Sequence, residues 1–377
     1  MLQERKGDRL PVAKPGDSLT FEFRHYRRGD EACIIELFER TFGRTMGREE
    51  SARHWEWEYL RNPSGKQAIL LAFAGETLAA QYAVLPLRVQ VDGRVMDGAL
   101  SLDTATDAAF RGRGLMPKLA EQLYAELAEQ GHVAVFGFPN VLSTPIIFGK
   151  LRWIELAPFP LLLKPLAGAV RRKLGERWGA RAPLAYLAEG IWAVWRPRPR
   201  PLPSGLEVVE VRRFPDDTDE FWQRASRGKR FIVVRDRGYL DWRYADNPEH
   251  LYRLWTLREP GRLVGTLVTR VEPRFGLNTG FILDVLCEES APAVATALVA
   301  LAERTMGEEG AQVLSCLMYP GTVLHRALRK AGFIPVPRRL FPQEIHFGYR
   351  PLAPTVDPAL LRDPSHWYVT WGDSDVV

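Results

Sequence analysis

The chain has 377 residues, a formal net charge of +5, 46% hydrophobic residues and 26% charged residues. These values are ordinary for a soluble globular protein and leave room for two domains of usual size. The three cysteines, Cys33, Cys287 and Cys316, are too few and too scattered for a disulfide framework or a cysteine-based zinc site. Cys287 and Cys316 lie in apolar runs and are expected in the core.

The beginning of the chain is polar. Residues 1–20 have no apolar region of the kind that a signal peptide needs, so we expect a loose leader and a cytoplasmic protein. No uncharged apolar run approaches the length that spans a bilayer. Basic charge is concentrated in 161–200, which holds nine Lys and Arg against two Glu. Charge confined to one segment is poor evidence for a nucleic-acid partner, and none is expected.

The stretch before residue 92 predicts helices and strands by its periodicity. In chain order we expect a strand at 21–26, a helix at 30–42, an aromatic-rich helix at 51–63, and strands at 68–74, 78–85 and 87–91. Asn62-Pro63 ends the aromatic helix, because the residue before a proline disfavours helical geometry. Asp92-Gly93 is a hairpin signal after the last of these strands.

The next stretch, 103–131, is the most informative. A strand is expected at 99–106, followed by a glycine-containing loop, Arg111 to Gly114, and a helix. The helix prediction rests on leucines at 115, 119, 123 and 127, which are spaced by four and therefore share one face. Gly131 stands where a left-handed helix cap is expected.

A strand, a glycine loop and a helix N-terminus together favour an anion. Glycines let the backbone approach a ligand, the first-turn N–H groups point outward, and the helix dipole attracts negative charge. Arg111 and Arg113 add cationic donors. No Gly-Lys-Ser/Thr follows, so the loop is not a Walker loop. The alternative is a solvated turn before an ordinary helix.

The order Arg-x-x-Gly-x-small, after a strand and before a helix, resembles the pyrophosphate-binding motif of the GNAT acyl-CoA N-acyltransferases. Arg111, Gly112 and Gly114 match, whereas Met116 stands where the family has Gly or Ala. The next unit is also similar to the family: a strand at 132–138, an Asn, and a helix at 143–153 that closes on Arg152-Trp153. The family often has on this helix a Tyr that acts as the general acid and protonates the departing thiolate. The nearest position here is Phe148.

The resemblance implies acetyl-CoA or another acyl-CoA as co-substrate, and no metal is expected because no His/Asp/Glu cluster has ligand spacing. Carried over residue by residue, the cofactor site comprises Thr104, Ala105, Thr106, Arg111, Gly112, Arg113, Gly114, Leu115, Met116 and Asn140. The pantetheine arm would pair with the splayed end of the strand at 103–106, whose backbone would polarise the thioester carbonyl.

Acyl transfer to an amine requires a base. Asp103 is the first candidate, because it is a carboxylate in an otherwise apolar and hydroxyl-bearing strand at the edge of the thioester site. The alternative is a structural Asp that binds backbone at a strand bulge. His54, Glu56 and Glu58 on the aromatic helix are second candidates, since that helix borders the acceptor in the family.

The second half of the chain repeats the order of the first. Trp57, Tyr59, Asn62 and Pro63 recur as Trp242, Tyr244, Asn247 and Pro248 at one constant spacing; Leu102-Asp103 recurs as Leu283-Asp284 and Trp153 as Phe333 at nearly that spacing. This pattern predicts a tandem duplication. We therefore expect an α/β fold with two tandem GNAT-like domains, each a mixed, mostly antiparallel sheet flanked by helices.

The second copy lacks the phosphate loop, because Glu288 and Glu289 stand where a pyrophosphate would bind. Its expected role is to cover the acceptor side of the first domain or to form a homodimer. The expected limits are a leader at 1–20, domains at 21–160 and 205–350, a connector at 161–204 and a tail at 351–377.

The connector has two readings. Apolar clusters within 161–195 around a basic stretch predict a helical pair with a solvated basic face. The alternative is a contact with a membrane surface or an acidic partner through 161–200. Residues 196–204, rich in proline, are expected to form a stiff end of the connector.

The expected activity is acyl transfer, most simply of an acetyl group, from CoA to a small-molecule, sugar or peptide amine. The amine would attack directly in a ternary complex, because no Ser/His/Asp or Cys/His motif for a covalent intermediate is present. Two alternatives are a catalytically silent CoA-binding or scaffold protein and a tandem-GNAT transferase with an aminoacyl donor. The loop from Arg111 to Gly114 speaks against the aminoacyl donor.

Overall fold

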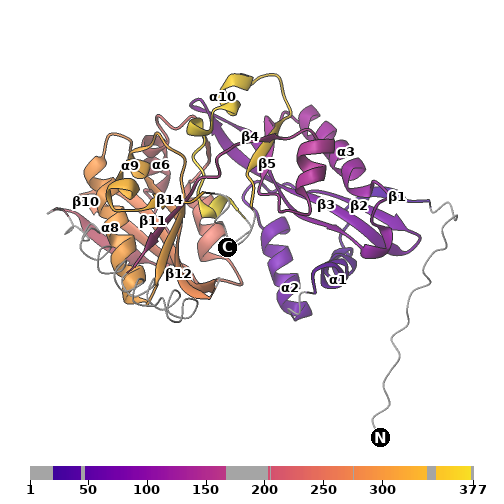
Figure 1. Ribbon diagram of the computed structural model, residues 1–377, viewed down its shortest axis with the longest axis horizontal. Helices are drawn as coiled ribbons and strands as arrows, with labels where there is room; N and C mark the ends of the chain where they lie inside the picture. Colours follow the sequence, from indigo (N-terminus) through magenta and orange to yellow (C-terminus); the bar gives the residue numbers. More distant parts are fainter. Residues whose placement is uncertain are drawn as a thin grey trace, which may run out of the picture.

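The computed structural model describes residues 20–43, 47–166, 203, 205–274, 276–337 and 345–374. It consists of two halves, each with a mixed sheet flanked by helices, as expected (Figure 1). No helix in the described ranges is both long and apolar enough to cross a membrane. The leader, most of the basic connector and the prolines from 197 to 201 lie outside the described residues.

The first half follows the predicted order of elements. These are β1 (Glu22–His25), α1 (Glu31–Phe42), α2 (Arg48–Trp55), a π-helical turn η1 (Glu56–Leu60), β2 (Ala68–Ala74), β3 (Thr77–Val91), β4 (Arg94–Thr106), a 3-10 turn η2 (Ala108–Phe110), α3 (Leu115–Glu129), β5 (Ala134–Gly137), η3 (Pro145–Lys150) and β6 (Ile154–Glu155). The four leucines of α3 are all at most 4% exposed. They form a cluster on one face of the sheet, and α1 and α2 cover the other face (Figure 1).

The strands predicted at 78–85 and 87–91 are one strand, β3, and Pro86 does not interrupt it. Pro86 pairs with Ala99 of β4 on one edge of β3. On the other edge, β2 pairs only as far as Val84 and β9 (Phe231–Val233) pairs from Val89. The missing N–H of the proline therefore costs no ladder hydrogen bond to either of these strands.

The second half repeats the architecture. Its elements are β8 (Glu207–Val211), α6 (Thr218–Ala225), β9, α7 (Arg237–Leu240), a π-helical turn η5 (Asp241–Ala245), β10 (Arg253–Glu259), β11 (Arg262–Arg274), β12 (Leu277–Cys287), α8 (Pro292–Glu308), β13 (Val313–Leu317), α9 (Val323–Lys330), β14 (Ile334–Pro335), β15 (Gly348–Pro351), α10 (Pro358–Arg362), η7 (Pro364–His366) and η8 (Trp371–Asp373). Each sheet has one parallel pair at its centre, β4 with β5 and β12 with β13. The remaining pairs are antiparallel.

The two halves exchange strands: one strand of the first half lies in the second sheet, and two strands of the second half, β9 and β15, lie in the first sheet. The first sheet has the order β1-β2-β3-β4-β5-β15-β6, and the second, read in the same direction, β8-β10-β11-β12-β13-β7-β14. β7 (Leu161–Pro165) follows the first half in sequence but pairs with β13, whereas β15 follows the second half but pairs with β5 (the yellow strand beside β5 in Figure 1).

The exchange corrects two expectations. The helix predicted from Leu161 is wrong for residues 161–165, which form strand β7, because a short apolar run fits a buried strand as well as a helix. The expected limit at 350 falls within β15, and the limit at 160 assigns β7 to the connector although β7 is a strand of the second sheet. A buried ion pair holds β7 in place, since Lys164 Nζ lies 2.6 Å from Glu303 Oε1 of α8.

The two π-helical turns meet between the halves. Trp57 Nε1 donates to the carbonyl of Trp242 at 2.7 Å, and Trp242 Nε1 donates to the carbonyl of Trp57 at 2.9 Å. The two rings stack with centroids 5.1 Å apart. This reciprocal contact is what a two-fold relation between the halves requires. Both tryptophans belong to a hydrophobic cluster that contains residues of each half, so the interface is an apolar core.

The C-terminal segment, residues 367–374, packs between the halves rather than forming a tail (yellow in Figure 1). Trp371 Nε1 donates to Ser315 Oγ of β13 at 2.9 Å, and the Tyr368 hydroxyl donates to the carbonyl of Val285 in β12. The segment is therefore bound to both strands of the parallel pair of the second sheet.

Candidate active site

The two central strands of the first sheet separate at one end. β4 pairs with β5 only from Ala99 to Ser101, opposite Val135 to Gly137. β5 ends at Gly137, and β4 continues for five residues, Leu102–Thr106, toward the glycine loop. We call this opening the fork. A chain-like ligand could lie along this edge of β4 and use its backbone groups as a strand would.

The glycine loop follows the fork directly. Asp107 begins it, and its side chain accepts from Ala109 N at 2.9 Å, which closes the turn η2. Gly112 and Gly114 have φ of 78° and 72°, a conformation that other residues adopt only at a cost, so both glycines are required here. Arg111 and Arg113 are exposed, and Gly114 caps the N-terminus of α3. The loop thus presents two guanidinium groups and a helix N-terminus to solvent.

The other predicted cofactor residues divide into three groups. Thr104, Ala105 and Thr106 lie on β4 beyond its pairing with β5. Leu115 and Met116 are 4% and 6% exposed and pack their side chains into the core, so only their backbone can face an anion. Asn140 is exposed after β5, and its side chain accepts from Leu142 N at 3.0 Å and Ser143 N at 3.1 Å.

A β-bulge interrupts β4 at the fork. Gln81 pairs with Ala105 and Ala83 pairs with Leu102, so two residues of β4, Asp103 and Thr104, oppose one residue of β3. Asp103 has φ of 48°, and its Oδ2 accepts from the Tyr59 hydroxyl at 3.1 Å. Because side chains alternate along a strand, a bulge changes the face to which a residue points. Asp103 therefore faces α1 and α2.

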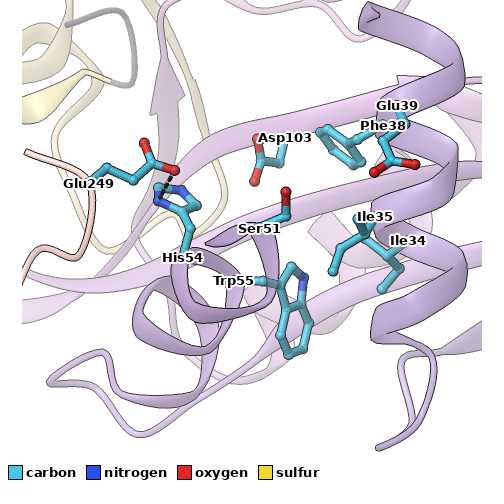
Figure 2. Close-up of a pocket in the computed structure, with 9 residues that line it drawn as sticks. All are labelled: Ile34, Ile35, Phe38, Glu39, Ser51, His54, Trp55, Asp103 and Glu249. Atoms are coloured by element: carbon cyan, nitrogen blue, oxygen red, sulfur yellow. Dashed lines mark ion pairs between the residues drawn. The ribbon is translucent and has the colours of Figure 1, made fainter. Parts of the chain in front are cut away.

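Asp103 lines a pocket on that face (Figure 2). The pocket holds about 520 Å³ of space, part of it open to solvent. Its other lining residues are Ile34, Ile35, Phe38 and Glu39 from α1, Ser51, His54 and Trp55 from α2, and Glu249 from the second half. An apolar wall with acidic groups is thus placed on one face of the sheet, and the helix that begins at the glycine loop lies on the other.

A family model described as an acetyltransferase (GNAT) domain matches residues 22–153. This range contains the fork, the glycine loop and the bulge. Residues 22–153 form a GNAT domain. No curated protein matches the chain by sequence.

Solved structures share the fold over most of the chain. A conserved protein of unknown function from Enterococcus faecalis V583, a probable N-acyltransferase, aligns with 89% of this chain and 73% of its own, with a TM-score of 0.59 and 15% identity. A GCN5-related N-acetyltransferase from Anabaena variabilis covers 88% of this chain and 73% of its own, with a TM-score of 0.57 and 11% identity. Saccharomyces cerevisiae N-myristoyltransferase with bound myristoyl-CoA covers 97% and 86%, with a TM-score of 0.56 and 14% identity. At these identities the likeness establishes the fold alone, a mixed α/β architecture with two GNAT-like sheets flanked by helices.

Two second candidates for the base do not fit the geometry of the GNAT domain. Glu56 is half-buried, is not among the residues that line the pocket, and lies 2.8 Å from Arg61 Nη2 in an ion pair. His54 does line the pocket, but it lies 2.9 Å from Glu249 and 3.5 Å from Glu58. Burial alone lowers the pKa of His54, whereas the two carboxylates raise it more strongly, to about 10. His54 is therefore a cation at neutral pH and has no lone pair for a proton.

Sequence reasoning missed Glu249, because it searched for acids within the first half. Glu249 follows Asn247-Pro248, the recurrence of Asn62-Pro63, and this recurrence was the one signal that could have pointed to it. Through the ion pair with His54, the second half closes one side of the pocket of the GNAT domain (Figure 2). The expected covering of the acceptor side is consistent with this contact.

The ion pair predicts a pH dependence of stability. Because folding raises the pKa of His54 from 6.5 to about 10, its contribution is complete below 6.5 and is lost as the pH rises through about 10. Since 27% of the side chain is exposed and solvent screens the charge, we expect roughly 2 kcal/mol. Urea unfolding of the wild type and of His54→Gln at neutral and alkaline pH measures this. If both proteins lose the same amount of stability between neutral and alkaline pH, the contact between His54 and Glu249 is not ionic.

In the second half β12 also continues beyond its pairing with β13, but the C-terminal segment packs against both strands there. Asp284 corresponds to Asp103, and its Oδ2 accepts from the Tyr244 hydroxyl at 3.0 Å as Asp103 accepts from Tyr59. The buried guanidinium of Arg235 lies 3.1 Å from Asp284 Oδ2 and 2.6 Å from Asp373 Oδ1 of the C-terminal segment. This segment therefore occupies the place where the first half has its pocket and fork.

The acids expected in place of the phosphate loop make structural contacts. Glu288 lies 3.2 Å from Arg224 Nε and also pairs with Arg262. Glu289 lies 3.1 Å from Lys229 Nζ and accepts from Val323 N at 2.7 Å. Among the described residues, no group of three or more His, Cys, Asp or Glu is arranged to hold a metal ion.

Proposed function

We propose that the chain is an acyl-CoA-dependent N-acyltransferase, most simply an N-acetyltransferase, that acts on a primary amine. The observation that carries the proposal is the continuous path formed by the fork and the glycine loop, with Asp103 and the pocket on the opposite face. The path has a place for a pyrophosphate at one end and for a thioester at the other.

The cofactor residues act by position and charge. Arg111, Arg113 and the first-turn amides of α3 bind the pyrophosphate. The backbone of β4 from Thr104 to Thr106 pairs with the pantetheine arm and polarises the thioester carbonyl. A five-residue strand segment is about 17 Å long, which sets the distance between the two ends of the cofactor site. Asn140, at the end of β5, borders the fork.

The amine enters from the pocket. Asp103 takes a proton from its nitrogen, and the free lone pair attacks the thioester carbon, so the C–N bond forms as the C–S bond breaks. The apolar wall of Ile34, Phe38 and Trp55 positions an amine that carries an apolar body. The second half has no phosphate loop and contributes Glu249 to this pocket, which supports one active site per chain.

One observation favours a second candidate, a CoA-binding module without turnover. Phe148, at the position where the family often has the acidic Tyr, packs against the ring of His346 with centroids 5.7 Å apart and has no proton to give. A transferase with an aminoacyl donor is disfavoured by the exposed arginines of the loop. Binding of CoA and turnover therefore have to be measured separately.

The first experiment is calorimetric titration of acetyl-CoA into the wild type and into Arg111→Ala with Gly114→Val. We expect the double change to weaken binding at least 100-fold, on the order of 3 kcal/mol, because it removes a charge-assisted donor and forces valine into a left-handed conformation.

The matched control is Arg262→Ala with Gly261→Val in the β10–β11 hairpin, because Gly261 also has φ of 72°. This control should bind as the wild type does. Release of free thiol in the presence of a panel of amines then separates an enzyme from a silent module. If the wild type binds neither acetyl-CoA nor a longer acyl-CoA, the proposal is wrong.

A further inference from the structure

Four polar side chains form a chain of hydrogen bonds that ends at the fork. Trp153 Nε1 donates to the Tyr124 hydroxyl at 3.1 Å, the Tyr124 and Tyr82 hydroxyls bind each other, and Tyr82 lies 2.8 Å from Ser101 Oγ. Trp153, Tyr124 and Tyr82 are at most 5% exposed within the cluster that packs α3 on the sheet. We call these four residues the hydroxyl chain.

The chain has a direction, because the indole of Trp153 can only donate. Tyr124 accepts this hydrogen bond and, being buried, would leave its own hydrogen unsatisfied unless it donates to Tyr82. Tyr82 then donates to Ser101 Oγ. Ser101 is the last residue of the hydroxyl chain. Because its oxygen accepts from Tyr82, its own hydrogen points away from the hydroxyl chain. Burial raises the pKa of Tyr82 to about 12 and that of Tyr124 well above its usual value, so both remain protonated.

Ser101 stands at the point where the fork opens. It is the last residue of β4 that pairs with β5, opposite Gly137. A Cβ on Gly137 would lie 2.9 Å from the carbonyl oxygen of Ser101 and 3.4 Å from its Cβ, so only glycine fits opposite Ser101 without a shift of the backbone. Unlike the other three residues of the hydroxyl chain, Ser101 is only partly buried. A cofactor arm that runs from the glycine loop along β4 ends here.

The second sheet lacks the hydroxyl chain. At the spacings that relate the two halves, Tyr82 corresponds to Leu267, Ser101 to Ile282 and Trp153 to Phe333, all buried and apolar. The same strand order therefore forms without the polar groups of Tyr82, Ser101 and Trp153. The half that has the phosphate loop also has the hydroxyl chain. This indicates that the hydroxyl chain functions in ligand binding and is not needed to form the fold.

We propose that the Ser101 hydroxyl is the hydrogen-bond donor to the sulfur of acyl-CoA as the C–S bond breaks. This inference rests on the function proposed above and names the group that stabilises the leaving thiolate where Phe148 has none. The bonding pair of the C–S bond passes to sulfur, the amine proton passes to Asp103, and Ser101 keeps its proton. The thiolate then takes its proton from solvent. Trp153, Tyr124 and Tyr82 are positioning residues that orient the serine.

The test requires no acceptor. The thiolate of product CoA absorbs in the ultraviolet, so titration of the protein–CoA complex gives the pKa of the bound thiol. A hydrogen bond to the anion favours it, and we expect Ser101→Ala to raise this pKa by about one pH unit, equal to about a tenfold loss of thiolate. Tyr82→Phe should change it in the same direction by a smaller amount, because the serine is retained but loses its orienting donor.

Ser315→Ala is the matched control, since it removes a buried serine hydroxyl that binds a tryptophan in the second half. It should leave the thiol pKa unchanged. If CoA binds and the thiol titrates identically in the wild type, Ser101→Ala and Tyr82→Phe, Ser101 is not the donor, while the CoA site stands. If CoA does not bind the wild type, both this inference and the proposed function fail. Should Ser101→Ala not fold, Tyr82→Phe alone decides between the first two outcomes.

Discussion

Replacing Asp103 by Asn is expected to lower turnover by about 100- to 10,000-fold, the range that a general base contributes. The affinity for acetyl-CoA should stay within roughly a factor of two, because the side chain points to the pocket and not to the glycine loop. An amide oxygen can still accept from the Tyr59 hydroxyl, so the substitution removes the basic group and keeps the contact that a structural Asp would need.

The measurement is the rate of thiol release with an accepted amine, together with calorimetry and thermal unfolding. Tyr59→Phe removes the same hydrogen bond from the other side and should cost far less turnover. Asp284→Asn is the matched control in the second half and should lower stability but not the rate per folded molecule. Equal losses of turnover in Asp103→Asn and Tyr59→Phe would assign Asp103 a structural role.

Arg235→Met is expected to destabilise the protein by about 3–5 kcal/mol, because removal of one partner leaves a buried charge uncompensated. Arg235 is 0% exposed, and its guanidinium binds both Asp284 and Asp373, each at most 3% exposed. Methionine keeps much of the volume, so loss of charge pairing dominates over a cavity. The C-terminal segment should become accessible to protease first, since Asp373 anchors it.

Urea unfolding measures the loss of stability. The matched control is Arg258→Met, whose partner Asp217 is 30% exposed, and a partly exposed pair should contribute about 1 kcal/mol or less. If Arg235→Met and Arg258→Met destabilise equally, the carboxylates of Asp284 and Asp373 do not depend on Arg235.

Local patterns were sufficient to predict the glycine loop. Gly112 and Gly114 adopt left-handed φ, and α3 has an apolar face. Both features depend only on residues that are close together in the sequence. The recurrence of Trp57 as Trp242 also predicted the two halves. The reciprocal hydrogen bonds of these residues could not be predicted, since spacing carries no information on which faces meet.

Features that depend on distant segments could not be read from the sequence. Glu249 meets His54 only because two halves pack, so the charge state of His54 and its loss as a candidate base follow from the tertiary structure. The apolar run at 161–165 fits a helix or a strand until its partner β13 is known. The role proposed for Ser101 could not be predicted from the sequence. It depends on the contact of Ser101 with Tyr82 and on the position of Ser101 beside the end of β5.

The exchanged strands determine when each half can be completed on the ribosome. The GNAT domain is synthesised first, yet β5 receives its neighbour β15 only after residues 348–351 have left the exit tunnel. Until then one edge of the first sheet has open backbone groups, and such edges bind other chains. The second sheet does not wait in this way, because β7 is made before it. The sheet of the GNAT domain is therefore completed last, and one of its edges stays open for most of translation.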